Sequence, residues 1–323
     1  MSGGGFLGLY GLTVLAEFEK ETGRPIARSF DLIAGTSVGG IIALGLAAEV
    51  PAADLKALFE SHGTRIFSTR HAPRGLLEKI VDVLRGLFSP KYKAEGLRSA
   101  LEAMLGDRCL RDLKHRVIVP AINLSKGRPQ IFKTPHHPTF RLDLALRAVD
   151  VAMATAAAPT YFPLAQIGDQ LFADGGLYAN SPDELALHEA EHFLKIPRAD
   201  IRMLSIGTTT AEFSFSHRAG LNFGLLKWAL GQRLVQVILS SQQRHTDYML
   251  KHKLGDAYIR IDELQSREQQ CDLGLDTAND SAQRTIRSIA QGSVQRFISD
   301  DRLRSLLAHA APAVEWPAMS KEA

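Results

Sequence analysis

Residues 31–40 read DLIAGTSVGG, and this stretch decides the fold. A short apolar run, residues 32–34, leads into Gly35-Thr36-Ser37-Val38-Gly39, and residues 41–48 are apolar and compatible with a helix. The order predicts a buried strand, a very tight turn and a helix, which is the G-x-S-x-G nucleophile elbow. Glycines flank the serine because side chains would collide in so tight a turn. The helix directs its positive end at the serine, which indicates Ser37 as a nucleophile for acyl transfer.

A membrane span is the competing interpretation of the same region, because residues 32–48 carry no charge. The run is shorter than the ~20 residues that cross a bilayer, and glycines interrupt it. A buried strand, elbow and helix are therefore favoured.

Composition limits the classes of protein that the chain can belong to. It has 323 residues, 45% hydrophobic and 23% charged, which suits one large α/β domain or two modest ones. A net charge of +3 does not argue for nucleic-acid binding. Two cysteines, Cys109 and Cys271, form neither a metal-type spacing nor a disulfide framework, and no acidic loop has calcium-binding spacing. These spacings predict no metal site. The few cysteines, together with an N-terminus that lacks the basic region of a signal peptide, predict a cytoplasmic protein.

Strand-like apolar runs alternate with helix-like runs, which is typical of an α/β protein with a mostly parallel sheet and helices on both faces. The expected strands are 30–34, 116–123, 130–133, 170–173, 201–206 and 257–261. The expected helices are 9–21, 38–49, 54–62, 95–105, 144–155, 182–194, 221–250 and 280–298. We expect a catalytic core over 1–210 and a mainly helical part over 211–323 that completes the same domain.

Two segments suggest surfaces that could move or dock. Residues 66–90 mix basic and apolar side chains, which predicts an amphipathic cap helix or a membrane-facing surface, or equally a solvated helix packed on the core. Apolar positions in 221–250 cover more than one helical face. That stretch is a candidate for an element that moves or assembles, with burial in the core as the alternative.

A serine nucleophile needs a base, and Asp174 is the best candidate. It follows the expected strand 170–173 and begins an Asp-Gly-Gly turn, in which the backbone can approach another element closely. None of the eleven histidines has a diagnostic setting. A Ser-Asp-His triad nevertheless stays open, with one of three histidines completing it: His188, His192 or His245.

Together, three motifs resemble those of the patatin-like phospholipases: GGGFLG at 3–8, GTSVG at 35–39 and DGG at 174–176. Residues 156–162 and 204–208 are also similar, so the resemblance covers roughly the first two-thirds of the chain. It implies a patatin-like three-layer fold and a serine esterase that degrades membrane phospholipid with no cofactor. It also implies a dyad in which Ser37 is the nucleophile and Asp174 the base. The backbone N–H groups of Gly3, Gly4 and Gly5 would hold the oxyanion.

A narrower resemblance is carried by residues 112–117, 132–138 and 152–163, which look like the CapV-type patatin-like effectors of bacterial cyclic-oligonucleotide antiphage defence. It implies a phospholipase A that is activated by a cyclic dinucleotide and acts at the inner face of the membrane. A homo-oligomer is compatible with this resemblance. The nucleotide-binding residues stay unknown. By its residue types alone, the KTPHHP stretch at 133–138 fits either a phosphate-binding turn or a structural turn with hydrogen-bonded histidines.

The chain departs from the family pattern at two points. Leu7 stands where the family loop has arginine, and only Met1 and Ser2 precede Gly3 where the family has a central strand. We therefore expect a gap or an unpaired edge beside the strand at 30–34. These departures keep two alternatives open: an unregulated lipase or thioesterase of the same fold, and a catalytically weakened module that binds nucleotide or lipid.

Overall fold

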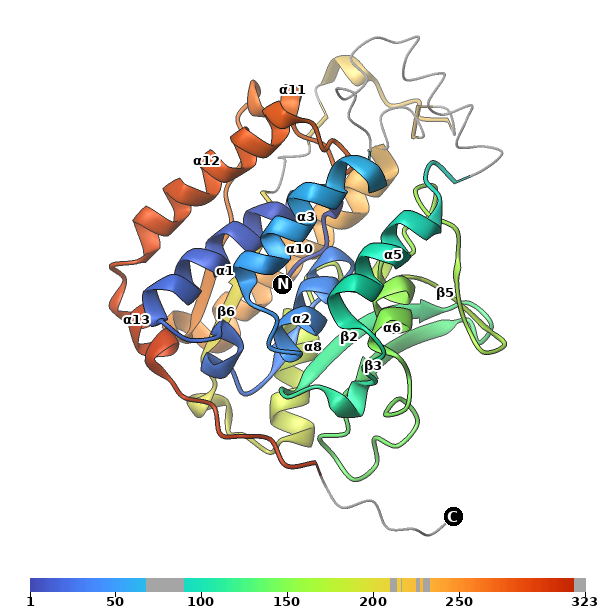
Figure 1. Ribbon diagram of the computed structural model, residues 1–323. Coiled ribbons are helices and arrows are strands. Elements are labelled where there is room, and N and C mark those ends of the chain that lie inside the picture. Colours follow the sequence, from blue (N-terminus) through green and yellow to red (C-terminus); the bar gives the residue numbers. More distant parts are fainter. Residues whose placement is uncertain (68–89, 210–213, 216, 225–226, 229–232, 317–323) are drawn as a thin grey trace.

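A computed structural model of the chain describes residues 1–67, 90–209, 214, 215, 217–224, 227, 228 and 233–316 (Figure 1). The larger of its two sheets has five strands in the order β1-β2-β5-β4, and β3 also pairs with β2. Its strands are β1 (Ile33–Ala34), β2 (Val117–Asn123), β3 (Arg128–Lys133), β4 (Ala165–Ile167) and β5 (Gln170–Asp174). The smaller sheet pairs β6 (Met203–Ile206) with β7 (Tyr258–Ile261).

The larger sheet is mixed, so the expectation of a mostly parallel sheet is wrong. Only β1 and β2 are parallel there, whereas β2–β3, β2–β5 and β4–β5 are antiparallel. Short links explain two of the three antiparallel pairs: residues 124–127 join β2 to β3, and residues 168 and 169 join β4 to β5. Links of this length form hairpins and are too short for the crossover that parallel strands need.

The first two residues lie between the two sheets, inside the molecule (Figure 1). The Met1 nitrogen donates to the Ala34 carbonyl at 2.7 Å, and the Ser2 N–H donates to the Ile206 carbonyl at 3.0 Å. The Thr36 N–H donates to the Met1 carbonyl at 3.2 Å. The sequence predicts a gap or an unpaired edge beside β1. The two sheets are indeed separate, and Met1 and Ser2 lie between them, hydrogen-bonded to the backbone of one sheet each.

The helices surround these sheets and match the apolar periodicity of the sequence (Figure 1). The longer helices are α1 (Gly8–Thr22), α2 (Val38–Ala47), α3 (Ala52–Ile66), α5 (Ala94–Leu105), α6 (Ala148–Thr155), α10 (Arg233–Leu254), α12 (Asp280–Phe297) and α13 (Asp301–Ala308). The shorter ones are α7 (Gly176–Ala179), α8 (Asp183–His188), a π-helical turn (Glu189–Phe193) and α11 (Gln269–Asp272). In the described residues, no helix is both long and apolar enough to cross a bilayer.

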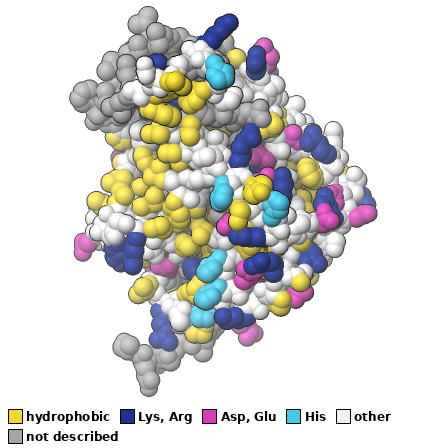
Figure 2. Space-filling view, turned by 180° about the vertical axis from the view of Figure 1, so that it is seen from behind, with side chains coloured by type: hydrophobic (Ala, Val, Ile, Leu, Met, Phe, Trp, Pro, Cys, Tyr) yellow, Lys and Arg dark blue, Asp and Glu magenta, His cyan; other side chains and the backbone are white. Residues whose placement is uncertain are grey.

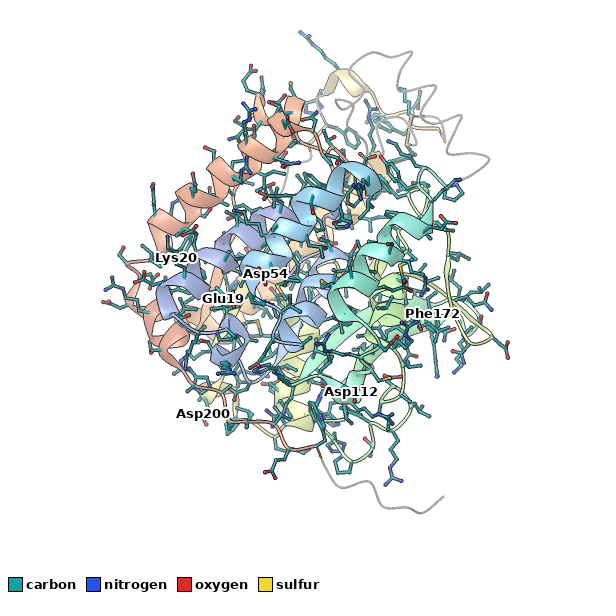
Figure 3. All side chains as sticks on the ribbon, viewed as in Figure 1. Glu19, Lys20, Asp54, Asp112, Phe172 and Asp200 are labelled. Carbon is teal, nitrogen blue, oxygen red and sulfur yellow. The ribbon has the colours of Figure 1, made fainter. Side chains whose placement is uncertain are left out.

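Helix α2 is buried along its whole length because it is apolar on every side. It packs on β2 and against α6, and α1 packs against both α3 and α12. Glu19 links α1 to the start of α3 and to Ile26. Its carboxylate accepts hydrogen bonds from the N–H groups of Ile26 at 2.9 Å and Ala52 at 2.5 Å (Figure 3). Most of the predicted segment 66–90 lies outside the described residues, and so does part of 221–250.

Candidate active site

Ser37 stands in the sharp turn between β1 and α2, with φ 55° and ψ −125°. Residues other than glycine rarely adopt this backbone conformation, so the surrounding contacts must stabilise it. The Ser37 N–H donates to Thr155 Oγ1 at 2.9 Å, and Thr36 Oγ1 donates to the Ala179 carbonyl at 2.6 Å. A side chain at position 35 is excluded, because its Cβ would lie 2.0 Å from the Gly39 carbonyl oxygen. The predicted elbow is therefore present.

Asp174 ends β5 directly beside this turn and is almost completely buried. Ser37 Oγ donates to Asp174 Oδ2 at 2.6 Å, and the Gly176 N–H donates to Asp174 Oδ1 at 2.7 Å. Burial raises the pKa of Asp174 to about 6, although both hydrogen bonds favour the ionised carboxylate. A carboxylate with this pKa is ionised at neutral pH and is more basic than an exposed one, which suits proton abstraction from a hydroxyl.

The three glycines of the N-terminal loop differ in what their N–H groups do. The Gly3 N–H donates to the Asn180 carbonyl at 2.9 Å, so it is used within the protein. Gly4 and Gly5 line the same cavity as Ser37, and neither N–H has an acceptor within the described part of the chain. Gly5 has φ +56°, and a Cβ there would collide with the Leu275 carbonyl. The geometry thus fits the Gly4 and Gly5 N–H groups as oxyanion donors. It does not fit the predicted role of the Gly3 N–H, which instead anchors the loop to Asn180.

The Ser37–Asp174 pair opens into an apolar cavity of about 140 Å³. Side chains of α2, α3 and α5 form one part of its wall, and α10 contributes Val235 and Leu239. The apolar side chains of the three wall helices are Val38, Ile41, Ile42, Leu55, Leu58, Phe59, Ile66, Leu97, Ala100, Leu101 and Met104. Such a wall favours a hydrocarbon chain over a polar ligand.

The sequence profile of the patatin-like phospholipase family matches residues 1–187. This chain belongs to that family. A cGAMP-activated phospholipase of Pseudomonas aeruginosa (strain BWHPSA011 / Pa011) is 46% identical over 317 residues, covering 97% of this chain and 92% of the relative. Two further cGAMP-activated phospholipases, from Escherichia coli (strain TW11681) and Vibrio cholerae serotype O1, are each 37% identical over 306 residues. Both alignments cover 87% of this chain, with 84% and 85% of the respective relatives.

The histidines of the open triad alternative do not reach Asp174 in this patatin-like chain. His188 and His192 stack on each other with ring centroids 5.1 Å apart, and His245 is exposed on α10. In the part of the chain that the structure describes, no imidazole hydrogen-bonds to Asp174, whose two oxygens accept from Ser37 and Gly176. Among the described residues, Asp174 is thus hydrogen-bonded to Ser37 and to no imidazole, which is the geometry that the predicted dyad requires.

The KTPHHP stretch forms a structural junction. Glu189, in the π-helical turn, accepts from Lys133 Nζ at 2.5 Å and bonds to His136 Nε2 at 2.9 Å. His136 Nδ1 also bonds to Thr134 Oγ1 at 2.8 Å. Because the cation and the buried imidazole both face one carboxylate, this turn fits the structural alternative better than the phosphate-binding one. Lys133 additionally lies over the rings of Phe140 and Phe193, at 4.4 and 4.2 Å from their centroids.

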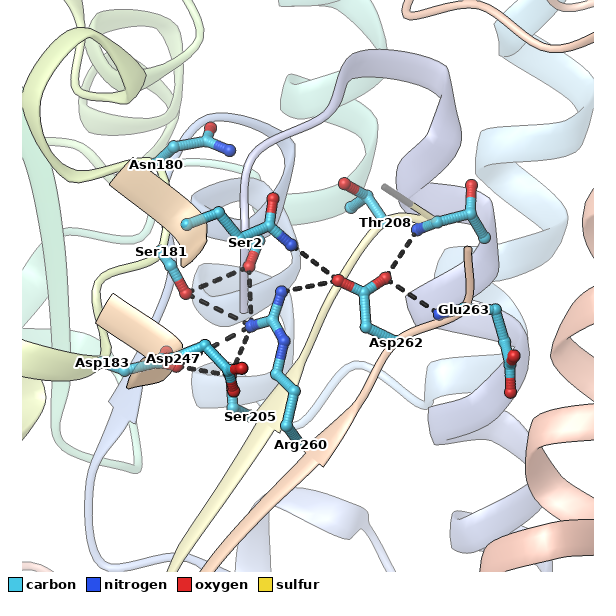
Figure 4. Close-up of polar contacts among 12 residues, drawn as sticks. Ser2, Asn180, Ser181, Asp183, Ser205, Thr208, Asp247, Arg260, Asp262 and Glu263 are labelled. Carbon is cyan, nitrogen blue, oxygen red and sulfur yellow. Dashed lines mark hydrogen bonds and ion pairs between the residues drawn. The ribbon is translucent and has the colours of Figure 1, made fainter. Parts of the chain in front are cut away.

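Several residues that support the patatin-like site were missed by sequence reasoning (Figure 4). Thr208 Oγ1 donates to the Gly3 carbonyl at 3.0 Å, and Asn180 Nδ2 donates to the same oxygen at 3.5 Å. Arg260 and Asp262 lie behind this contact and pair at 2.7 Å. A lone arginine in the otherwise apolar strand Tyr258–Ile261 is the one sequence signal that could have revealed a buried ion pair.

On the face in Figure 2, basic and acidic side chains are interspersed, and hydrophobic side chains gather in a band. Among residues with described positions, no group of three His, Cys, Asp or Glu side chains is placed to hold a metal ion.

Proposed function

We propose that this protein is a phospholipase of the A type that cGAMP activates in antiphage defence. The hydrogen bond of 2.6 Å between Ser37 Oγ and Asp174 Oδ2, at an apolar cavity, is the observation that carries the hydrolase assignment. The activator rests on the relatives, which are cGAMP-activated phospholipases over nearly the same length. No cofactor enters the proposal, and its substrate is membrane phospholipid reached from the cytoplasmic face.

In the proposed reaction, Asp174 takes the hydroxyl proton as Ser37 Oγ attacks the ester carbonyl. The tetrahedral oxyanion accepts hydrogen bonds from the Gly4 and Gly5 N–H groups, which stabilises developing charge. The bond to the glycerol oxygen then breaks, Asp174 returns the proton to that oxygen, and lysophospholipid leaves. Water, deprotonated by Asp174, then attacks the acyl carbonyl carbon. The bond to Ser37 Oγ breaks, Asp174 returns the proton to Oγ, and the fatty acid leaves.

The proposed architecture keeps the catalytic core at 1–210 and lets residues 211–323 complete the same domain in a patatin-like three-layer fold. Pairing of β7 with β6 and packing of α12 on α1 support one domain rather than two.

The proposed regulatory element is α10, which touches the site in two ways. Val235 and Leu239 line the cavity, and the Gln242 side chain bonds to the segment that follows Asp174. A cyclic dinucleotide that binds one position or assembly state of α10 better than another would shift the population toward the active state.

The test measures fatty acid release from phospholipid vesicles with and without cGAMP. We expect low basal release that cGAMP raises at least tenfold, which corresponds to about 1.4 kcal/mol of coupling. Ser37→Ala and Asp174→Ala should each abolish release, and the double variant should lose no more than either alone, because the two residues act as one unit.

Full release without cGAMP would identify an unregulated lipase instead, with thioester substrates as the next assay. Binding of cGAMP or lipid without any release would identify a weakened binding module. Single substitution of His188, His192 or His245 should leave most of the activity, and a loss as large as that of Ser37→Ala would overturn the dyad.

A further inference from the structure

A buried polar cluster behind the glycine loop joins segments that lie far apart in the sequence (Figure 4). At its centre is the guanidinium of Arg260, whose side chain is 9% exposed. Arg260 Nη1 donates to Ser205 Oγ at 2.6 Å and to the hydroxyls of Ser2 and Ser181 at 3.2 Å each. Arg260 Nη2 donates to Asp262 Oδ2 at 2.7 Å. One cation therefore connects the N-terminal segment, the segment after Asp174, and both strands of the smaller sheet.

The Arg260 guanidinium stays positively charged in this cluster. Burial alone would lower the pKa of Arg260, but the carboxylates of Asp262 and Asp183 outweigh burial and raise it. The guanidinium is thus charged at every working pH, and its planar fork donates in several fixed directions at once. A lysine ammonium at the same place is a single point of charge and cannot reach the same set of acceptors.

The cluster reaches the glycine loop through Asp262 and Thr208. Asp262 Oδ1 accepts from the Thr209 N–H at 3.0 Å, and its carboxylate packs so closely on Gly207 that a Cβ there would lie 2.1 Å from Asp262 Cγ. This fixes the 207–209 turn. From the turn, Thr208 Oγ1 donates to the Gly3 carbonyl at 3.0 Å.

The hydrogen bond from Thr208 to the Gly3 carbonyl also fixes the direction of the Gly4 N–H. The two groups belong to one planar trans peptide and point in opposite directions. Three successive glycines carry no side chain that could anchor them, and their backbone has wide conformational freedom. An oxyanion donor stabilises charge well only if its orientation is set before the reaction. An outside anchor is therefore what this loop needs.

We propose that Thr208 and Arg260 are positioning residues that orient the Gly3–Gly4 peptide so that the Gly4 N–H faces the oxyanion. Thr208 acts directly on the peptide, and Arg260 acts through Asp262 and Ser2. The inference rests on the proposed hydrolase function and adds residues from the smaller sheet to its machinery.

Thr208→Val tests the inference because it keeps the side-chain shape and removes the hydroxyl donor. We expect kcat to fall ~10–100-fold while KM changes little, a fraction of the loss of ~10²–10³ from removing an oxyanion donor outright. Affinity for a trifluoromethyl ketone, whose serine adduct places an oxyanion in the same position, should fall by the same factor. The pKa seen in the rate profile should stay where Asp174 sets it.

Thr13→Val is the matched control, since Thr13 is also buried, its Oγ1 donates to the backbone carbonyl of Leu9 at 2.8 Å, and neither residue lines the cavity at Ser37. It should cost stability and leave kcat unchanged. Arg260→Met should act like Thr208→Val, and Arg260→Lys should recover only part of the rate. If Arg260→Met fails to fold, Thr208→Val decides alone.

Two outcomes separate this inference from the proposed function. Labelling of Ser37 by a fluorophosphonate probe needs no natural substrate, so a wild-type protein that stays unlabelled with saturating cGAMP present would contradict the hydrolase itself. A labelled wild type together with equal labelling rates and equal kcat in Thr208→Val would overturn the positioning role and leave the hydrolase standing.

Discussion

Asp174 serves its proposed role because of where its carboxylate is buried. A solvent-exposed aspartate has a pKa near 3.8, whereas burial raises that of Asp174 to about 6. The folded protein therefore favours the protonated carboxyl more than the unfolded chain does. The stability linked to this proton is complete below about pH 4 and is lost as the pH rises through about 6.

Asp174→Asn should consequently stabilise the protein at pH 7.5 while it abolishes hydrolysis. The gain is at most about 3 kcal/mol, because each pKa unit corresponds to about 1.36 kcal/mol. It should vanish at pH 4, where the wild-type carboxyl is protonated too. Thermal unfolding at both pH values checks this, with the exposed Asp54→Asn as the control. Equal midpoints for Asp174→Asn and the wild type at pH 7.5 would contradict the origin of the shift.

The wild-type rate profile follows from the same pKa. Since the base must be ionised, kcat/KM should increase with pH and level off above about 6 to 7.

At the scale of elements, α10 and α7 are joined by one side chain. Gln242 Nε2 donates to the Leu177 carbonyl at 2.9 Å, and Gln242 Oε1 accepts from the Asn180 N–H at 3.2 Å. Leu177 and Asn180 follow the Asp174-Gly175-Gly176 turn in the sequence, so we propose that a shift of α10 would reach Asp174 and the segment that holds Gly3 through this contact.

Gln242→Ala should break this link and lower the rate measured with saturating cGAMP at least severalfold. The neighbouring Ser241→Ala is the matched control, because the Ser241 hydroxyl is exposed and donates only to the Ile238 carbonyl of the same helix. Fatty acid release by the two variants checks the prediction. Release by Gln242→Ala equal to that of Ser241→Ala would show that α10 does not act through this contact.

For the whole molecule, activation by cGAMP requires that the ligand bind the active folded state in preference to the inactive one. A ligand that binds the folded protein and not the unfolded chain also stabilises the fold. Saturation at 100 times the dissociation constant should then stabilise the protein by about 2.7 kcal/mol. Differential scanning fluorimetry should record a rise in the unfolding midpoint, and sedimentation velocity should show whether activation also changes the assembly state. An unchanged midpoint at saturating cGAMP would remove the activator from the proposal, even if the hydrolase assay succeeds.

The local pattern of the chain was enough to predict most helices, the elbow at Ser37 and the turn at Asp174, and the motifs at these turns carried the resemblance to the family. The elbow at Ser37 and the turn at Asp174 depend on glycine spacing and apolar periodicity, which are local properties that neighbouring residues express together. The same is true of α2, whose continuous apolar run predicts burial on every side.

Only the tertiary structure decided the strand directions, the short strand β4 and the anchoring of the glycine loop. Hairpin links at 124–127 and 168–169 make neighbouring strands antiparallel, so the sheet is mixed. The strand Ala165–Ile167 is too short to show a detectable alternation of apolar and polar residues. The separate uses of the Gly3 and Gly4 N–H groups depend on Asn180, Thr208 and Arg260, which reach the loop across at least 177 positions of sequence. A buried polar cluster assembled from such distant segments leaves no periodic signal, because Ser2, Ser181 and Ser205 meet Arg260 only in the folded protein.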